Sequence, residues 1–135
     1  MKITRFYKDV LGAALANTQW SWGAVDRVTN RVYLRVWLDE IEPHADGERV
    51  LVLRKNPLRR SAGYPERIRH LDAIRNGASG FGVVCITKNP GSAGKRSIVG
   101  FNENELLVLG QLVDEDAAVF ALVDGRVAFN DLART

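Results

Sequence analysis

The chain has 135 residues and a mass of 15.0 kDa, which predicts a single domain over residues 1–135 that can bury a core without disulfides or metals. Hydrophobic residues make up 46% and charged residues 26%, which excludes wholesale disorder. The apolar run 117–123 is far shorter than the roughly 18 residues of a membrane-spanning helix. The first residues lack the apolar stretch of a secretory signal, and one cysteine cannot form an intrachain disulfide, so a cytoplasmic protein is expected.

Charge is distributed unevenly along the chain. Residues 1–48 carry a net charge of −1, residues 49–96 carry +9 and residues 97–135 carry −5, so the overall +3 conceals a strongly basic middle third. Most of the basic residues are arginines, which make bidentate contacts to phosphates and stack on planar rings. A polyanion is therefore the expected partner, unless folding disperses these charges over the surface. The expected phosphate contacts are Arg54, Lys55, Arg59, Arg60, Arg69, Lys88, Lys95 and Arg96.

A β-hairpin is predicted near the start of the chain. Residues 20–26 and 31–38 are rich in aromatic and β-branched side chains, and a short polar stretch with Thr29 and Asn30 separates them. Side chains alternate along the second strand, so one of its faces is aliphatic and is predicted to be core. The opposite face can stack bases while it neutralises phosphates. That face carries Arg31, Tyr33, Arg35 and Trp37.

The register of this hairpin decides where its tryptophans lie. Pairing of Asp26 with Arg31 places Trp22 opposite Arg35 and puts Trp20 on the same face. A slip of one residue turns both tryptophans inward, where they would be core residues, as most tryptophans are. With the first register, base discrimination is assigned to Trp20, Trp22, Tyr33, Arg35 and Trp37, with Asn17 and Ser21 as hydrogen-bonding groups.

The next part of the chain is predicted to hold one strand between two loops. The strand spans residues 49–54, and the loop 42–47 precedes it. A second loop is expected over residues 56–64, because this stretch contains a proline, a glycine and two adjacent arginines.

A helix is predicted to follow the second loop. Pro65 suits its first turn, and Gly77 suits its end. Ile68, Leu71 and Ile74 fall on one side of this helix.

The third quarter of the chain predicts two strands and a short helix. Residues 81–87 are apolar enough for a central strand, and residues 97–101 predict another. Asn102 and Glu105 form a variant of the capping box, which predicts a helix over residues 104–109.

The chain ends in a second predicted hairpin. Residues 118–123 and 126–129 are its strands, and Asp124 with Gly125 has the signature of a type I′ turn. About five to seven strands with two or three short helices predict an α+β fold built on a small curled sheet or an open β-barrel.

Motifs of catalysis and metal binding are not convincing in this sequence. Residues 91–97 resemble a phosphate-binding loop, but Arg96 occupies the position of its Ser or Thr, and a strand follows where a helix is needed. His44 and His70 are far apart in sequence, and one cysteine cannot build a cysteine-rich zinc site. Cys85 lies in an apolar run and is predicted to be an inert core residue. We therefore expect no cofactor, no metal site and no enzymatic activity.

Several segments together resemble a known superfamily. The chain contains, in this order, WSWGAVD, RVYLRVW, a basic loop, HLDAIRNG and FGVVCI. This order is similar to that of small domains fused ahead of HNH nucleases in modification-dependent restriction proteins. Those domains are similar in layout to the PUA-like superfamily, whose SRA, EVE, ASCH and YTH members hold a nucleotide base in an aromatic-lined pocket of a small β-barrel. The resemblance covers residues 15–130, carries over no individual site residue, and implies recognition of nucleic acid without cleavage.

The expected function is therefore that of a nucleic-acid-binding domain that reads a modified or unpaired base, with DNA favoured over RNA and no membrane contact. Two alternatives stay open. A protein-interaction or regulatory module would present the same aromatic surface to a nuclease or another protein. A small-molecule enzyme would assemble its site from residues remote in sequence, and a pocket with buried titratable groups would favour this alternative.

Overall fold

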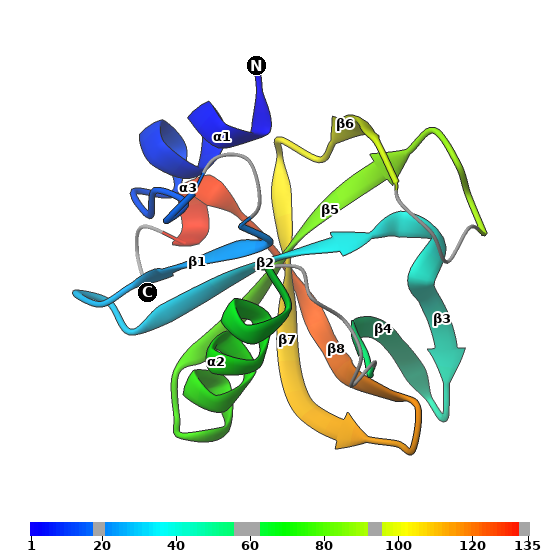
Figure 1. The fold of residues 1–135 in the computed structure, drawn as a ribbon. Helices are drawn as coiled ribbons and strands as arrows, with labels where there is room; N and C mark the ends of the chain where they lie inside the picture. Colours follow the sequence, from blue (N-terminus) through cyan, green and yellow to red (C-terminus); the bar gives the residue numbers. More distant parts are fainter. Residues whose placement is uncertain (18–20, 56–62, 92–95, 133–135) are drawn as a thin grey trace.

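The computed structural model describes residues 1–17, 21–55, 63–91 and 96–132 (Figure 1). Within these ranges, three short α-helices accompany one sheet of eight strands. The strands are β1 (Gly23–Asp26), β2 (Arg31–Trp37), β3 (Ile41–His44), β4 (Gly47–Arg54), β5 (Ser79–Thr87), β6 (Ile98–Phe101), β7 (Glu105–Asp114) and β8 (Ala118–Ala128). The helices are α1 (Ile3–Arg5), α2 (Gly63–Arg75) and α3 (Phe129–Leu132), with the π-helix η1 (Phe6–Val10) and the 3-10 helix η2 (Leu38–Glu40). None of the helices in the described ranges is long and apolar enough to cross a membrane.

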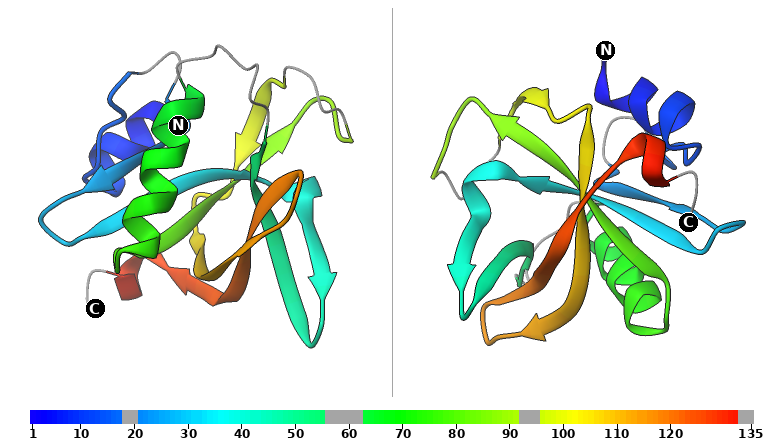
Figure 2. Two further views of the ribbon diagram at one scale, coloured as in Figure 1. Left: turned by 60° about the horizontal axis from the view of Figure 1, so that its bottom comes forward. Right: turned by 180° about the vertical axis from the view of Figure 1, so that it is seen from behind.

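The strands lie in the order β1-β2-β5-β7-β8-β4-β3, and β6 pairs with β5. Paired strands are antiparallel except for β2 and β5, which are parallel. A parallel pair needs a long crossover connection, and β3, β4 and α2 lie between these two strands in the chain. The sheet curls without closing into a barrel (Figure 2), which confirms the expected α+β class with a curled sheet.

Each face of the sheet has its own apolar cluster. On one face, Leu71 of α2 packs among buried side chains of β2, β4, β7 and β8. On the other face, α1, η1 and α3 lie together (Figures 1 and 2). The ring centroid of Phe6 lies 5.0 Å from that of Phe101 and 4.9 Å from that of Phe129. Because both faces are covered, β5 is buried on two sides and contains a long apolar run.

Helix α2 forms where the sequence predicts a helix, and Leu71 and Ile74 of its apolar side pack in the core. Gly77 follows its last turn with a φ of +109°, a left-handed conformation that favours glycine at a helix end. Ile68, at the edge of that side, is 37% exposed. The polar side chains of α2 find partners on the segment before β1, on β2 and on β4, and these contacts hold the helix in its orientation. Its buried side chains are Glu66, Arg67, His70 and Leu71.

The capping signal at Asn102 precedes a strand, and the expected helix over residues 104–109 is wrong. Asn102 Oδ1 accepts hydrogen bonds from the backbone N–H groups two and three residues further on, at 2.8 and 3.1 Å, as a helix cap would. The chain then continues as β7, which pairs with β5 on one side and β8 on the other and buries Leu106 and Leu107. The pairing of β7 with β5 and β8 therefore outweighs the local signal for a helix start at Asn102.

The predicted hairpin turn at Asp124 and Gly125 is also wrong, because β8 continues through these residues. Val108 of β7 lies opposite Gly125, whereas its neighbour Leu109 lies opposite Val123. Asp124 is thus the additional residue of a β-bulge, so a turn-like dipeptide is accommodated inside a strand.

Two hairpins form at other places in the chain. β7 and β8 are joined at residues 115–117, where the N–H of Glu115 donates to the carbonyl of Ala118 at 2.8 Å. The loop expected over residues 42–47 is wrong, because this segment contains β3 and the turn to β4. Ala45 makes that turn with a φ of +51°. Most of the loop expected over residues 56–64 lies outside the described residues.

Candidate functional site

The first hairpin has the predicted register, but its aromatic face is not open. Asp26 lies opposite Arg31, in antiparallel pairing of β1 with β2. Tyr33 is only 1% exposed and stacks on Phe81, with ring centroids 5.6 Å apart. Tyr33 belongs to the apolar cluster that also contains residues of η1 and α3. The expectation that Tyr33 lies on an open stacking face is therefore wrong.

Two tryptophans of the hairpin are half-buried, and each has an arginine of the chain beside its ring. The carbonyl of Trp22 accepts a hydrogen bond from the N–H of Arg35 at 2.8 Å, and the guanidinium carbon of Arg67 lies 5.9 Å from the Trp22 ring. Trp37 packs against the apolar cluster beneath η1, and the guanidinium carbon of Arg96 lies 5.4 Å from its ring. Both rings therefore already have a cationic neighbour within the protein.

Asn17 and Ser21, the expected hydrogen-bonding groups, belong to a buried polar network. Ser21 is fully buried, and its Oγ accepts a hydrogen bond from the N–H of Asn17 at 2.9 Å. The same hydroxyl donates to Glu66 Oε2 at 3.0 Å. The guanidinium of Arg35 donates to the carbonyl of Ser21. This network joins the segment before β1 to α2 and β2, and Ser21 is closed to an external ligand.

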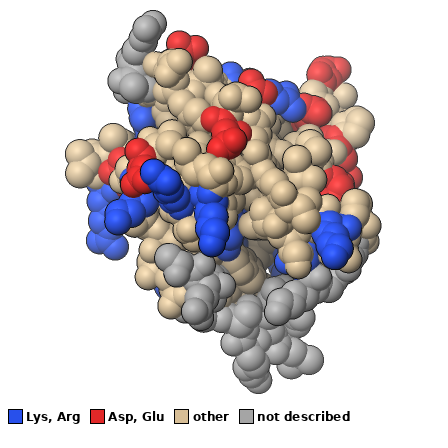
Figure 3. Space-filling view, turned by 90° about the horizontal axis from the view of Figure 1, so that it is seen from above, with Lys and Arg blue, Asp and Glu red and all other residues tan. Residues whose placement is uncertain are grey.

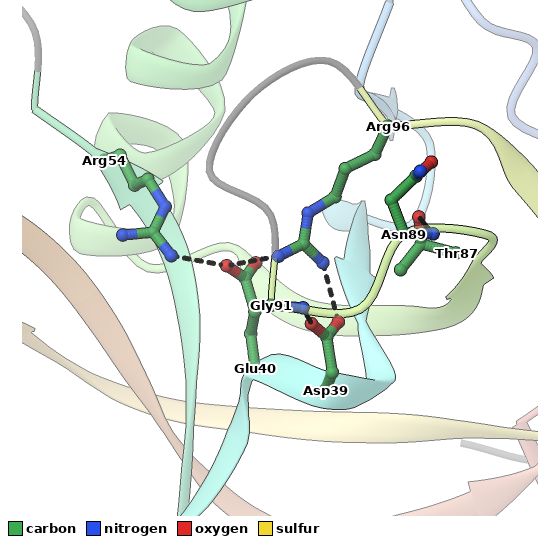
Figure 4. Close-up of polar contacts among 7 residues, drawn as sticks. All are labelled: Asp39, Glu40, Arg54, Thr87, Asn89, Gly91 and Arg96. Carbon is green, nitrogen blue, oxygen red and sulfur yellow. Dashed lines mark hydrogen bonds and ion pairs between the residues drawn. The ribbon is translucent and has the colours of Figure 1, made fainter.

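Two of the expected phosphate contacts are engaged in ion pairs with acidic residues of η2 (Figure 4). Arg96 lies 2.7 Å from Asp39, and Arg54 lies 2.9 Å from Glu40. Only 6% of the Arg96 side chain is exposed. Partial burial of Asp39 opposes its ionisation, but hydrogen bonds from Arg96 and from the N–H of Gly91 outweigh this and lower the pKa of Asp39. The Arg96 guanidinium is thus committed to the fold.

Other basic residues of the middle third are balanced by carboxylates from outside it. Arg49 lies 2.6 Å from Glu42 and 3.1 Å from Glu115, and Lys55 pairs with Asp114. Figure 3 shows one face of the molecule, on which acidic and basic side chains are interspersed. In the described part of the chain, folding therefore disperses much of the basic charge. Lys88 is exposed, and the expected contacts Trp20, Arg59, Arg60 and Lys95 lie outside the described residues.

A pocket of about 540 Å³ lies between α2, β1 and the segment that follows η1. We call it the α2–β1 pocket, and Figure 2 shows α2 beside β1. Arg69 is the one expected site residue in its wall. Small side chains make up most of the remaining wall, so the pocket has room for a ligand. It is lined by Ala14, Ala16, Gly23, Ala24, Val25, Arg27, Glu66, Arg69, His70 and Ala73.

Two buried polar side chains of this pocket have an atom without a hydrogen-bond partner. Glu66 is 4% exposed and His70 is 8% exposed, and they lie one helical turn apart on the same side of α2. The Ser21 hydroxyl donates a hydrogen bond to Glu66 Oε2, whereas Glu66 Oε1 and His70 Nδ1 have no hydrogen-bond partner. Burial, helped by the positive charges of Arg67 and Arg69, lowers the pKa of His70 to about 4, so its imidazole is neutral at physiological pH. Buried polar atoms without partners are rare. Each of these two atoms exposes less than 1 Å² of its surface, so both belong to the packed wall behind the pocket.

Gly23 allows α2 to lie close to β1 at this pocket. A Cβ atom on Gly23 would lie 2.6 Å from the carbonyl oxygen of Tyr33 and 3.3 Å from His70 Nδ1. The first distance is shorter than any side chain tolerates, so the backbone conformation of β1 and the position of the imidazole both depend on glycine here. The Gly23 that follows Trp22 in the sequence thus contributes to the pocket.

Two exposed arginines, Arg27 and Arg69, line the same pocket. Unlike Arg54 or Arg96, neither of them forms an ion pair with a carboxylate of the described residues. Their guanidinium groups come from the β1–β2 turn and from α2, which are distant in sequence. The pocket therefore carries two exposed cationic groups that suit an anion.

A second cavity of about 460 Å³ lies between α2, β4 and β8. Its charged side chains are largely paired, because Asp114 contacts both Lys55 and Arg75. Elsewhere, Cys85 is 1% exposed, and burial raises the pKa of its thiol to about 12. This confirms Cys85 as a core residue. Among the described residues, no group of three or more His, Cys, Asp and Glu side chains could hold a metal ion.

Arg27 and Glu66 are not among the residues that the sequence patterns single out, and His70 is considered there only as a metal ligand. The signal that could have found Glu66 and His70 together is their spacing of four residues on the predicted helix, where a carboxylate and an imidazole share one side. The apolar spacing of Ile68, Leu71 and Ile74 points to a neighbouring side of that helix and conceals this pair.

Comparison with known proteins adds no relative. No protein-family model matches the chain, no curated protein matches its sequence, and no solved structure matches its fold. A functional interpretation therefore depends on the geometry and chemistry of the α2–β1 pocket.

Proposed function

We propose that the protein binds nucleic acid and takes one unpaired nucleotide into the α2–β1 pocket. The observation that carries this proposal is the presence, in the wall of one pocket, of two exposed guanidinium groups, Arg27 and Arg69, that form no ion pair with a carboxylate of the described residues. A nucleotide has the complementary chemistry, because its phosphate is an anion.

The two arginines are suited to the phosphates that flank the bound base. A guanidinium group forms bidentate hydrogen bonds to phosphate and keeps its charge at any physiological pH. Arg27 and Arg69 also lie on different elements, so phosphates on either side of the base can each meet one of them. The contribution of the arginines is independent of the base sequence.

The base in this proposal must be unpaired. In a duplex the base edges are occupied by pairing and the base faces by stacking, so a base reaches a pocket only in a single strand or after it has left the stack. A PUA-like architecture and a cytoplasmic setting belong to this proposal, with DNA favoured over RNA. The aromatic hairpin face does not, because Tyr33 is buried and the residues that line the α2–β1 pocket are not aromatic.

The proposal is tested by fluorescence anisotropy with a labelled single strand, the matching duplex and a duplex that contains one unpaired nucleotide. We expect the protein to bind the single strand and the interrupted duplex more tightly than the intact duplex. Arg27→Ala and Arg69→Ala should each weaken binding and reduce the log-log salt slope by about one. Arg126→Ala is the control, because Arg126 is exposed on β8 and lies beside Glu48.

Two results would contradict the proposal. One is the absence of binding at low salt, which would leave a protein-interaction module as the better interpretation. The other is binding that Arg27→Ala and Arg69→Ala leave unchanged, which would place the nucleic acid elsewhere on the surface.

A pair of titratable side chains in the pocket wall, Glu66 and His70, favours a second candidate function, a small-molecule enzyme. A buried carboxylate and an imidazole that share a pocket can act as general acid and base. Incubation of the protein with free nucleotides, followed by chromatography of the products, tests this candidate. Turnover that Glu66→Gln abolishes would support it, and unchanged nucleotides would count against it.

A further inference from the structure

We infer that the α2–β1 pocket prefers a nucleotide that carries a phosphomonoester, at the end of a strand or as a free mononucleotide, to a nucleotide within a strand. This inference rests on the proposed function, since it concerns which nucleotide the same pocket holds. A phosphomonoester carries a charge of about −1.5 to −2 at neutral pH and three terminal oxygens that accept hydrogen bonds. A phosphodiester within a strand carries one negative charge and two such oxygens.

The exposed charge in the wall of the pocket is positive. Arg27 and Arg69 line the pocket and are exposed, and neither forms an ion pair with a carboxylate of the described residues. Among the described residues of the wall, Glu66 alone carries a carboxyl group, and it is 4% exposed. Ser21 donates a hydrogen bond to Glu66 Oε2, and Glu66 Oε1 exposes less than 1 Å². A phosphate in the pocket therefore meets two guanidinium groups and no exposed carboxylate of this wall.

Arg27 is presented by a hydrogen-bonded turn between β1 and β2. The Oδ1 atom of the preceding Asp26 accepts hydrogen bonds from the N–H groups of Val28 and Thr29, at 3.0 and 3.4 Å. Desolvation opposes the ionisation of Asp26, but hydrogen bonds from Thr29 and Val28 outweigh it and lower the pKa of Asp26. The Asp26 carboxylate thus caps the turn and forms no ion pair with Arg27. The Arg27 guanidinium is therefore left for a ligand.

Arg69 has an acidic residue on either side of it along α2, and both are engaged elsewhere. Glu66, three residues before it, is bonded to Ser21. Asp72, three residues after it, lies 3.2 Å from Arg75. Residues three apart on a helix are the nearest candidates for an ion pair with Arg69. Its guanidinium therefore also stays free for a ligand, and it reaches the pocket from the helix, whereas Arg27 reaches it from the turn.

The dimensions of the pocket suit a mononucleotide or the end of a strand. Its volume of about 540 Å³ lies within the range of roughly 300–1,000 Å³ that is typical of small-molecule sites. Its wall comes from α2, β1 and the segment that follows η1. A strand that enters by its end does not have to leave the pocket again, whereas an internal nucleotide needs a path out for the chain on both sides. A terminal nucleotide therefore brings more charge to the two arginines at a smaller steric cost.

Isothermal titration calorimetry with short oligo-dC strands of equal length, at one salt concentration, measures this preference. One strand carries a 5′-phosphate, one a 3′-phosphate and one a hydroxyl group at both ends. We expect at least one phosphorylated strand to bind about fivefold or more tightly than the hydroxyl strand, because its additional charge meets two exposed guanidinium groups. The two phosphorylated strands show which end the pocket takes. Free dCMP should likewise bind more tightly than deoxycytidine.

A capped strand tests whether charge is the cause of the preference. Its terminal phosphate is a methyl ester, so the phosphate group stays in place and one negative charge is lost. This strand should lose most of the preference over the hydroxyl strand.

Variants of the two arginines assign the preference to the pocket. Arg27→Ala and Arg69→Ala should each reduce the preference for a phosphorylated end. Arg126→Ala is the matched control, because Arg126 is an exposed arginine on β8 that lies beside Glu48 and outside the pocket wall. It should keep the parent preference.

The outcomes separate this inference from the proposed function. If all strands bind with equal affinity and Arg69→Ala weakens them alike, the protein binds nucleic acid and the inference is overturned. A preference that the methyl ester keeps in full, or that both pocket variants keep in full, overturns the inference as well. If no strand and no nucleotide binds at low salt, the proposed function itself fails.

Discussion

The guanidinium group of Arg67 on α2 donates a hydrogen bond to the carbonyl oxygen of Val52 on β4 at 2.5 Å. Its other terminal nitrogen donates to the carbonyls of Trp22 and Arg35, at 2.8 and 2.9 Å. One helical side chain therefore bonds the backbones of β2 and β4, two strands that are not neighbours in the sheet. Burial lowers the pKa of Arg67 to about 10, which leaves it charged at neutral pH.

Replacement of Arg67 by alanine should destabilise the fold severely. The variant loses three hydrogen bonds that the charged Arg67 side chain donates to backbone carbonyl groups. We expect this loss to lower the free energy of unfolding by about 3 kcal/mol or more. Urea denaturation followed by tryptophan fluorescence measures this change. Arg69→Ala is the control on the same helix, and a surface change of this kind should alter stability by no more than about 0.5 kcal/mol. Equal costs for the two variants would show that Arg67 does not hold the strands together.

The role of Arg67 also shows why the sequence predicts some parts of the fold and not others. The first hairpin depends on near neighbours, since Asp26 Oδ1 accepts the N–H of Val28 at 3.0 Å and Asn30 has a φ of +57°. These signals are visible in a short stretch of sequence. The partners of Arg67 are carbonyl groups on two distant strands, which nothing in the helix sequence indicates. The buried side of α2, and the pocket beside it, therefore escape prediction.

The stability of the protein should depend on His70 between about pH 4 and 6.5. Burial lowers the pKa of His70 in the folded protein to about 4, whereas in the unfolded chain it has the ordinary value of about 6.5. The unfolded chain therefore binds a proton that the folded protein does not, and the free energy of unfolding falls as the pH falls through this range. The loss is about 3 kcal/mol at most. Urea denaturation at several pH values measures it, and His70→Gln should flatten the profile. Parallel profiles for the two proteins would contradict this assignment.

The Cys85 thiol should be unreactive in the folded protein. The Cys85 side chain is 1% exposed, so a reagent cannot reach the sulfur. Burial also raises the pKa of the thiol to about 12, so very little of the reactive thiolate is present. We expect Ellman's reagent to react slowly at pH 8 in buffer and rapidly in denaturing urea, with one thiol per chain. A fast reaction in buffer would mean that the strand β5 opens readily or that the thiol is accessible.

Trp37 should contribute to stability and not to nucleic-acid affinity. Leu34 is fully buried in the cluster beneath α2, so Leu34→Ala should cost about 2–5 kcal/mol in the free energy of unfolding. Trp37 is half-buried against the opposite cluster, and Trp37→Ala should cost less, about 2 kcal/mol.

The binding measurement on Trp37→Ala separates the two places where a base could bind. If the base lies in the α2–β1 pocket, folded Trp37→Ala binds oligo-dC within about twofold of the parent, because Trp37 does not line that pocket. If the base stacks on the hairpin, the same variant loses about 1–3 kcal/mol of binding free energy while it stays folded. Arg69→Ala should show the reverse pattern, with weaker binding and unchanged stability. Thermal melts and anisotropy titrations on these two variants therefore place the base, and a folded Trp37→Ala that no longer binds would return the site to the hairpin.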